Sequence, residues 1–246
     1  MRRLLPDQGE LDEAALVEAY RVPAGRHLRV NFIASLDGAI TVDGKSAGLG
    51  SPGDKAVFRT LRALADVVLV GHGTAAAEGY RPVAADSAVG RLRAAIGRAP
   101  TAPIAVVSRR ASLAPGDRLA VPSTILVTCA AADPARRQAV ADAGVEVLVC
   151  GDDDVDLALA LDRLAERGLE QVLCEGGPTL FRSALTAGLV DELDLSIAPA
   201  LVGDAARLLG GSALPDPARL ALRQLLAEDD VLFARYDLAY DAAGGR

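Results

Sequence analysis

The stretch LEQVLCEGGPTLFRSAL, residues 169–185, joins a short apolar run to an acid, two glycines, a proline and a helical pattern. Val172–Cys174 predicts a buried strand, and Gly176 and Gly177 let the backbone turn tightly and approach a ligand closely. Pro178 suits the first turn of a helix, where its missing N–H costs nothing. The turn predicts an anion site, because the free N–H groups at the helix start favour a phosphate or pyrophosphate; these belong to Thr179, Leu180 and Phe181.

Glu175 stands beside this predicted anion site. A carboxylate does not serve as a phosphate ligand, so the acid is better matched to hydroxyl groups of a ligand or to a proton. An ordinary glycine-containing loop between a strand and a helix is the alternative for the motif as a whole.

Length and composition narrow the class of protein. The chain has 246 residues, of which 51% are hydrophobic, enough for a substantial core. The 33 acidic and 26 basic residues give a net charge of −7, which argues against a nucleic-acid or acidic-membrane partner. No apolar run approaches the ~20 residues that span a bilayer, and the start MRRLLPDQGELDEAAL meets acids and a proline too soon for a signal peptide. We expect a soluble, cytoplasmic protein with one domain over residues 1–246.

Cysteine and histidine content argues against metal chemistry. Cys129, Cys150 and Cys174 are odd in number, widely spaced and set in apolar surroundings, so we interpret them as buried hydrophobic residues. With only His27 and His72 available, neither a metal site nor histidine-based zinc or triad chemistry is expected.

Apolar runs alternate with amphipathic segments along the chain. The predicted strands are residues 28–34, 67–70, 104–108, 125–128, 145–149, 171–174, 193–198 and 231–238. The predicted helices are residues 53–65, 87–96, 134–143, 155–167 and 178–187. This order indicates an α/β fold in which helices flank a mainly parallel mixed sheet. The last two strands have no convincing helix between them, so an antiparallel pair is expected at the C-terminal edge.

One literal GxGxxG occurs, at residues 48–53. It would suggest a Rossmann dinucleotide site, but no strand directly precedes it and the next strand ends without an acid to hold a ribose. We interpret it as a glycine-rich loop that enters the helix at Gly53.

Two further predicted strands end in candidate ligand loops. Val67–Val70 runs into Gly71, His72, Gly73 and Thr74, where the backbone can approach a ligand, although a plain turn is the alternative. No catalytic role is assigned to His72.

The strand at residues 104–108 ends in Ser108, Arg109 and Arg110, at the sheet edge where open α/β folds bind ligands. A hydroxyl and two guanidinium groups suit a ribose 2′-phosphate, which predicts NADPH in preference to NADH. A solvated basic loop is the alternative.

Three charged positions have both a structural and a functional interpretation. Asp37, before Gly38, is a turn signal whose structural role is weighed above a catalytic one. Lys55 and Arg62 are seven residues apart on one helix face that could hold a substrate phosphate, and a charged solvent face is the alternative.

Three segments, taken in order, resemble one family: VNFIASLDGAITVDGKSAG, LRALADVVLVGHGTAAAEGY and CEGGPTLFRSALTAGLVDELDLSIAPALVGD. The resemblance is to the C-terminal reductase domain of bacterial riboflavin biosynthesis enzymes, in the form of the stand-alone pyrimidine reductases of actinobacteria. It covers about Leu28 to Leu238. It implies a dihydrofolate-reductase-like fold, NADPH as cofactor, a homodimer, and reduction of 5-amino-6-(5-phosphoribosylamino)uracil or a close analogue at its ribosyl group.

The resemblance implies a role for each matched position. Cofactor contacts would come from Ala34, Gly71, Gly73, Thr74, Glu78, Ser108, Arg109, Gly176, Gly177, Pro178, Thr179 and Leu180. Substrate contacts would come from Ser46, Lys55, Arg62 and Glu175. Glu175, Glu78 and Asp37 are the candidate catalytic residues.

Several positions depart from the family pattern. A basic residue after SLDG is Ala39 here, a tryptophan is Gly48, and an arginine of the expected phosphate clamp has become small, which leaves Arg81 out of register. Because Ala lacks the bidentate fork of Arg, the clamp is weakened. The alternatives are therefore a pterin or dihydrofolate-type reductase on the same scaffold, or a non-catalytic nucleotide-binding protein. Neither H-x-E nor P-C-x-x-C occurs, so no zinc-dependent deamination is expected.

Overall fold

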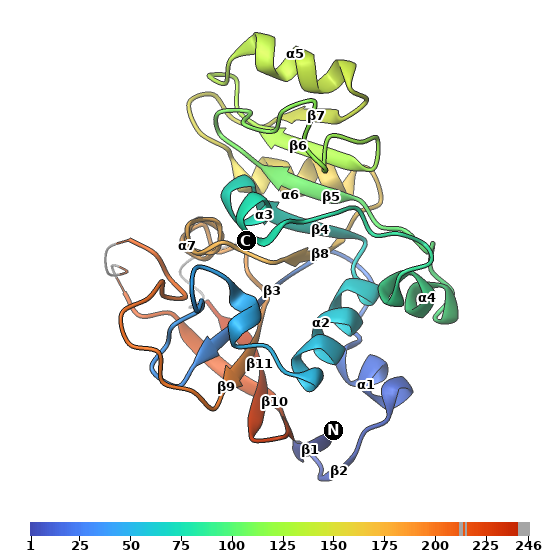
Figure 1. Cartoon of the computed structure of the whole chain (residues 1–246), viewed down its shortest axis with the longest axis vertical. Helices are drawn as coiled ribbons and strands as arrows, with labels where there is room; N and C mark the ends of the chain where they lie inside the picture. Colours follow the sequence, from blue (N-terminus) through green and yellow to red (C-terminus); the bar gives the residue numbers. More distant parts are fainter. Residues whose placement is uncertain (212–213, 215, 241–246) are drawn as a thin grey trace.

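The computed structural model describes residues 1–211, 214 and 216–240 of the chain. Its strands form one 11-stranded sheet in the order β2-β1-β10-β11-β9-β3-β8-β4-β5-β6-β7, which Figure 1 shows from bottom to top. The strands are β1 (Arg2–Leu5), β2 (Gly9–Glu10), β3 (His27–Ser35), β4 (Val67–Gly71), β5 (Ile104–Val107), β6 (Thr124–Thr128), β7 (Glu146–Val149), β8 (Gln171–Cys174), β9 (Glu192–Ala198), β10 (Arg219–Glu228) and β11 (Val231–Ala239). The helices are α1 (Glu13–Tyr20), α2 (Pro52–Leu64), α3 (His72–Glu78), α4 (Ala88–Ala95), α5 (Pro134–Asp142), α6 (Leu157–Ala165) and α7 (Pro178–Thr186).

The sheet has a parallel and an antiparallel part. Strands β9, β3, β8, β4, β5, β6 and β7 are parallel neighbours, whereas β11, β10, β1 and β2 continue the sheet antiparallel. This confirms the expected mainly parallel mixed sheet with an antiparallel C-terminal side. The expected strands at residues 193–198 and 231–238 do pair antiparallel, but β10, β1 and β2 lie beyond them, so β11 is not the edge.

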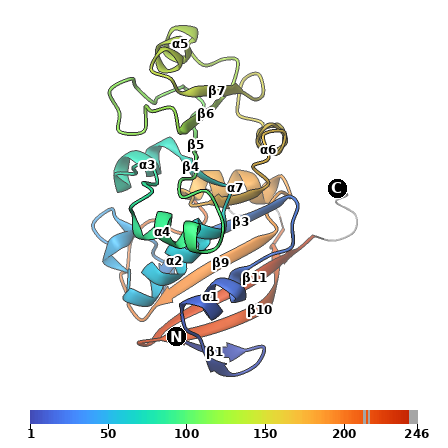
Figure 2. The same cartoon turned by 90° about the vertical axis from the view of Figure 1, so that its right-hand side faces the viewer.

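Helices cover both faces of the parallel part, as Figure 2 shows. Along β4, Val68 and Val70 pack into a core with residues from α1 to α5, while Val67 and Leu69 pack into a second core with α6 and α7. The alternation follows from the two-residue period of a strand, and it explains why the strands are nearly continuous apolar runs. Because β3, β8, β4 and β5 are parallel neighbours, their carboxyl ends lie along the same edge of the sheet.

The sequence analysis missed β10 and its turn. The segment RLALRQLLAE is rich in residues that favour helices, and pairing with β11 rather than local propensity makes it a strand. Asp229 and Asp230 form the two-residue hairpin turn at φ 48° and 66°. Asp tolerates this left-handed region, so the Asp-Asp pair was the available hairpin signal.

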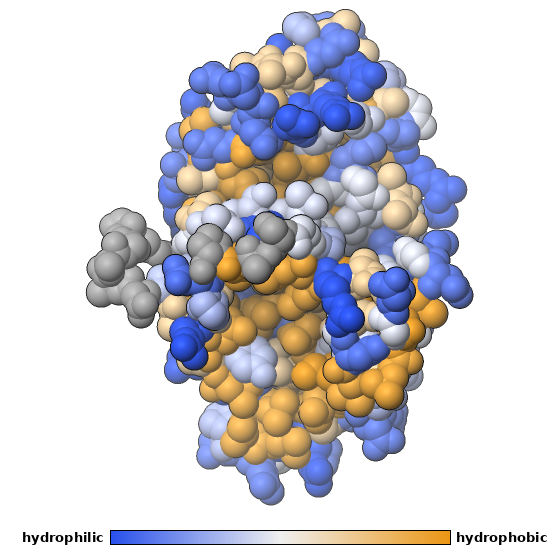
Figure 3. All heavy atoms as spheres, turned by 90° about the vertical axis from the view of Figure 1, so that its left-hand side faces the viewer, coloured by the Kyte–Doolittle hydropathy of each residue, from blue (hydrophilic) through white to orange (hydrophobic). Residues whose placement is uncertain are grey.

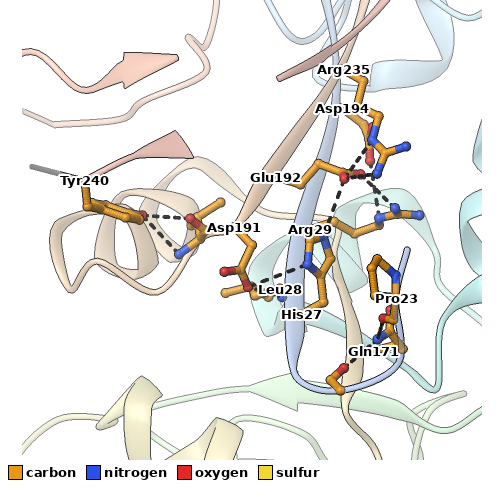
Figure 4. A network of polar contacts seen from close by, with 12 residues as sticks. Pro23, His27, Leu28, Arg29, Gln171, Asp191, Glu192, Asp194, Arg235 and Tyr240 are labelled. Atoms are coloured by element: carbon orange, nitrogen blue, oxygen red, sulfur yellow. Dashed lines mark hydrogen bonds and ion pairs between the residues drawn. The ribbon is translucent and has the colours of Figure 1, made fainter. Parts of the chain in front are cut away.

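A buried group of charges joins β3, β9 and β11 beneath α1 (Figure 4). Arg29 lies 2.8 Å from Glu192 and 3.6 Å from Asp194, and Arg235 also pairs with Glu192. The two guanidinium groups donate hydrogen bonds to the carbonyl oxygens of Tyr20 and Ala19, at the C-terminal end of α1. Cations favour this end of a helix dipole, so the cluster fixes α1 on the sheet.

Within the described residues, no helix covers most of the other face of the antiparallel part (Figure 2), although Leu195, Tyr236 and Leu238 pack against the edge of the core beneath α7. Figure 3 shows a broad apolar area over the lower part of this side of the molecule. Pairing in the sheet places on this face Leu195, Ile197, Leu220, Leu222, Leu225, Leu232, Tyr236 and Leu238. Leu220 and Leu222 keep 44% and 43% of their surface exposed. Large contiguous apolar patches of this kind are rarely exposed on monomeric soluble proteins.

Two simple expectations can be compared with the structure. The three cysteines are free and buried, as predicted. Within the described residues, no helix is long and apolar enough to cross a membrane.

Candidate functional site

Two helices without a side-chain cap begin next to one another at the carboxyl edge of the sheet. Helix α3 begins after Gly71 and α7 after Gly177, and neither N-cap residue offers a side chain to the free N–H groups. The backbone N–H of Gly71 donates to the carbonyl of Gly176 at 2.7 Å, which joins the two turns. By contrast, a Ser or Asp side chain caps α1, α2, α4, α5 and α6. The adjacent free N–H groups and positive helix ends suit a shared anionic ligand.

The glycines of this turn are required by close packing. Gly176 has φ 80°, and a Cβ there would lie 2.7 Å from the ring of Phe32. A Cβ on Gly177, which follows across a cis peptide bond, would lie 2.4 Å from Oγ1 of Thr74. Around Gly73, in contrast, the space for a side chain is open. The turn is therefore closed on the protein side and accessible on the side where a ligand would bind.

A cavity of about 260 Å³ lies in front of these helix starts. Gly73, Thr74 and Glu78 of α3 and Gly177 and Pro178 of the α7 turn contribute to its wall. Residues from β3 and from α2 also line it; they are Asn31, Phe32, Ile33, Asp54 and Phe58. The cavity thus connects the predicted anion turn with a partly apolar, partly acidic chamber.

Glu175 reaches this cavity from the end of β8 and is held by a buried ion pair. Both of its carboxylate oxygens accept from Arg62, through Nε and Nη2, at 2.7 Å. The Tyr80 hydroxyl donates a further hydrogen bond to Oε2. The side chain of Glu175 is 3% exposed and that of Arg62 is 14% exposed. Two-point pairing of this kind fixes both the position and the orientation of the carboxylate.

The environment of Glu175 shifts the pKa values of its two partners, Arg62 and Tyr80. Burial opposes the charge on Arg62, but neighbouring Glu175 raises the pKa of Arg62 above its usual value. Burial and the Glu175 charge also raise the pKa of Tyr80 well above its usual range, so its hydroxyl keeps its proton. The guanidinium of Arg62 lies 4.4 Å from the ring centre of Phe58 and 5.1 Å from that of Tyr80. Stacking and ion pairing together immobilise Arg62.

A second hollow, of about 450 Å³, adjoins the cavity. The two share Ser46, Phe58, Glu78 and Tyr80 in their walls. Arg62 lines only the second hollow and Glu175 only the first, so the ion pair stands between them. Exposed Arg81 also lines the second hollow, whose wall is therefore the basic side of the site.

Two more acids line the first cavity. Glu78 accepts a hydrogen bond from the backbone N–H of Ser46 at 2.8 Å, which ties α3 to the loop before α2. Asp54 projects from the first turn of α2. Burial raises its pKa, and the hydroxyl of Ser196 and the charge of Lys55 oppose that rise.

Some predicted site residues lie away from these hollows. Lys55 is exposed on α2 and lines neither of them, although it lies two turns before Arg62 on the same side of the helix. Ala34 is buried in the core beneath α7, and Ile33 and Phe32 line the cavity instead. Ser108 is buried at the end of β5, with Arg109 and Arg110 exposed beside it.

Asp37 has a structural environment outside both hollows. Its carboxylate accepts from the hydroxyl of Ser35 and from the backbone N–H groups of Val202 and Gly203, at 2.5 to 3.2 Å. The Ser35 hydrogen bond and these N–H groups lower the pKa of Asp37 to about 2. The acid therefore fastens the loop after β3 to the loop after β9.

Sequence reasoning missed Tyr80, Phe58 and Asp54 as site residues. Phe58 and Asp54 are four residues apart on α2, and Phe58 is four residues before Arg62, so helical spacing from Arg62 was the available signal. Tyr80 follows the glycine that ends α3, and no local pattern relates it to Glu175.

Comparison with known proteins shows the family of this chain. The profile of the RibD C-terminal domain family matches residues 26–231. The chain belongs to this family. Over 215 residues it is 34% identical to the 2,5-diamino-6-ribosylamino-4(3H)-pyrimidinone 5′-phosphate reductase of Methanothermobacter thermautotrophicus, covering 84% of this chain and 95% of that protein.

Solved structures give the same result for this RibD C-terminal domain protein. A pyrimidine reductase-like protein from Corynebacterium diphtheriae superposes with a TM-score of 0.78 at 30% identity, over 88% of this chain and 93% of the other. The diaminohydroxyphosphoribosylaminopyrimidine deaminase/5-amino-6-(5-phosphoribosylamino)uracil reductase of Thermotoga maritima shares the fold, with a TM-score of 0.67 at 16% identity over 87% of this chain and 57% of that one. The predicted family resemblance is thereby confirmed.

Proposed function

We propose that this protein is an NADPH-dependent reductase that converts the ribosyl group of a 6-ribosylaminopyrimidine 5′-phosphate to a ribityl group, with residues 1–246 acting as one reductase domain. The observation that carries the proposal is the pair of uncapped helix starts, α3 and α7, at the mouth of a cavity whose far side holds the Arg62–Glu175 pair. One end of this arrangement suits a pyrophosphate, and the other suits a polar substrate.

The residues present fit a nicotinamide dinucleotide. Gly73 leaves open space in front of α3, and Gly177 brings the α7 start against Thr74. The pyrophosphate would lie on the free N–H groups of Gly73, Thr74, Thr179 and Leu180. Ser108 and Arg109, with Arg110, would hold the ribose 2′-phosphate that distinguishes NADPH from NADH.

The residues around the cavity have separate roles in the proposed reaction. When bound, NADPH supplies a hydride to the anomeric carbon of the ring-opened imine, the nitrogen takes up a proton, and the products are the ribitylamine and NADP⁺. Glu175, fixed by Arg62 and Tyr80, places a negative charge where the substrate nitrogen gains positive character. Glu78 and Ser46 line both hollows, so they would face the ribose chain of a substrate bound across them. Arg62 and Arg81 supply the positive side on which the 5′-phosphate lies.

The enzyme acts as a cytoplasmic homodimer in this proposal. The uncovered face of β9, β10 and β11 is an apolar sheet surface with several half-exposed leucines (Figure 3). Burying it against the same face of a second copy would remove apolar surface from water on both chains, which is the usual composition of a permanent interface.

A substrate panel tests the proposed activity. Purified protein with NADPH is supplied with a ribosylaminopyrimidine 5′-phosphate, with dihydrofolate, or with neither, and loss of NADPH absorbance is recorded. We expect turnover with the ribosylaminopyrimidine alone. Turnover with dihydrofolate instead would identify a pterin reductase, and binding of NADPH without turnover of either compound would identify a nucleotide-binding protein.

A further inference from the structure

The first cavity is acidic. Its wall includes Asp54, Glu78 and Glu175, and no lysine or arginine is among the described residues that line it. Arg62 and Arg81 line the adjoining hollow instead. A ligand that presents N–H donors therefore suits the first cavity, and its anionic end suits the second.

The three acids differ in how far their oxygens are already occupied. Glu175 accepts three hydrogen bonds, from Arg62 and Tyr80. Glu78 accepts the backbone N–H of Ser46. Asp54 interacts with the hydroxyl of Ser196 and with the charge of Lys55, and both of its oxygens retain acceptor capacity. Asp54 is thus the acid best able to receive two donors from a ligand.

Asp54 also stands on a rigid element beside an aromatic ring. Its backbone N–H donates to the side chain of Ser51, which caps α2. Phe58 follows four residues later on the same helix face and lines the same cavity. An aromatic ring next to a carboxylate on one helix face is suited to a flat heterocycle, with the ring against Phe58 and the heterocycle edge toward Asp54.

The two pyrimidines named for related proteins differ at one ring position. A 2-amino-4-oxopyrimidine presents adjacent donors, N3–H and the 2-amino group, and can pair with both oxygens of a carboxylate. A uracil presents N3–H between two carbonyl groups, so one carboxylate oxygen would face a carbonyl lone pair. A half-buried carboxylate discriminates between the two rings, because the wrong ring leaves one of its oxygens facing an acceptor.

Resting on the proposed function, we infer that Asp54 is a specificity-determining residue that recognises the 2-amino and N3–H edge, so that the preferred substrate is a 2-amino-4-oxopyrimidine rather than a uracil. The 2-amino group is retained through the reduction. Glu175 acts at the anomeric end of the substrate, and Asp54 acts at the heterocycle.

The test compares kcat/KM for the 2,5-diamino-4-oxopyrimidine and the uracil substrates in wild-type protein, Asp54→Asn and Asp54→Ala. From the discrimination usual for a two-point base contact, we expect wild type to prefer the diamino substrate by about tenfold to a hundredfold. Both variants should lose this preference, through a lower kcat/KM for the diamino substrate and little change for uracil. Glu13→Gln, an acid in the first turn of α1 outside both hollows, serves as the control.

Three outcomes decide between the possibilities. Preference of the wild type for uracil, or equal losses for both substrates in Asp54→Asn, would overturn the role of Asp54 while leaving the reductase intact. Absence of turnover with both substrates would contradict the proposed function instead. NADPH affinity, measured by isothermal titration calorimetry in each variant, checks folding, and it should be unchanged by the Asp54 substitutions.

Discussion

Arg62 of α2 and Glu175 at the end of β8 meet in a two-point ion pair of 2.7 Å between the two hollows of the site. The residues are 113 positions apart in the chain, and the pair joins a helix on one face of the sheet to the turn that begins α7. Breaking a buried pair leaves an uncompensated charge, which is more costly than losing both partners together. Removal of either partner should therefore destabilise the fold and also change the charge of the site.

Glu175→Gln should lower kcat much more than it weakens the binding of NADPH. The amide keeps the shape of the side chain but removes the negative charge, so we expect kcat to fall by about a hundredfold, as for loss of one electrostatic catalytic group. The NADPH dissociation constant should change by less than about threefold, because the helix N–H groups are unaffected. Steady-state kinetics and NADPH titration measure both quantities. Equal losses would show that the acid is a scaffold element.

Tyr80→Phe should weaken the positioning of Glu175 without removing its charge. The ring and its stacking on Arg62 are kept, and one hydrogen bond to a buried carboxylate is lost. This costs about 1.5–3 kcal/mol where the acceptor is charged. We expect a lower unfolding temperature and a lower kcat with an almost unchanged KM. An unchanged kcat would assign Tyr80 to packing alone.

Replacement of Arg109 and Arg110 by Ala should weaken the binding of NADPH more than that of NADH. Both side chains are exposed beside Ser108, so the substitution should leave the fold intact. Loss of two charge-assisted contacts should reduce the preference for NADPH by at least about tenfold. The dissociation constants of the two nucleotides measure this preference. If their ratio stays constant, these arginines do not contact the 2′-phosphate.

Leu222→Glu should separate the proposed dimer. A charge on the apolar face of β10 cannot be buried against a second copy without a large desolvation cost. Light scattering should give twice the 25.3 kDa chain mass for wild type and a single chain for the variant. Val149→Glu is the matched control, since Val149 is also 43% exposed but lies on β7 at the other end of the sheet. A dimeric Leu222→Glu protein would exclude this face as the interface.

Glu192 should contribute acid-sensitive stability. Burial favours its neutral form, but His27, Arg29 and Arg235 lower the pKa of Glu192 to about 2. A carboxyl group whose pKa is lower in the folded than in the unfolded protein stabilises the fold at pH values above its unfolded pKa. This stability is lost as the pH falls from about 4.5 toward 2. Glu192→Gln should therefore reduce the free energy of unfolding by about 3 kcal/mol at pH 7. The difference from wild type should shrink on acidification, and a pH-independent difference would contradict this assignment.

Much of the parallel part of the sheet could be predicted from the sequence. Strands such as Val67–Gly71 are buried on both faces, so they are continuous apolar runs with clear ends. The turn at residues 175–178 was also predictable, because two glycines followed by a proline after an apolar run are typical of a tight turn into a helix. Gly176 and Gly177 indeed admit no side chain in the structure.

The missed features depend on contacts between distant segments. β10 is a strand because it pairs with β11, although its composition favours a helix. Tyr80 and Asp54 become site residues only when α3 and α2 are placed on the same edge of the sheet. Lys55 shares a side of α2 with Arg62, as a seven-residue separation requires, but it lies two turns away along the helix. Arg62 is covered there by Glu175 and Tyr80, whereas Lys55 is exposed.

Isotope transfer tests the central proposal most directly. NADPH that carries deuterium at the transferable position of its nicotinamide is incubated with the protein and the ribosylaminopyrimidine 5′-phosphate, and the product is analysed by mass spectrometry and NMR. We predict a ribityl product with one deuterium at C1′. An unchanged substrate with NADPH intact, or deuterium at any other carbon, would contradict the proposed reduction.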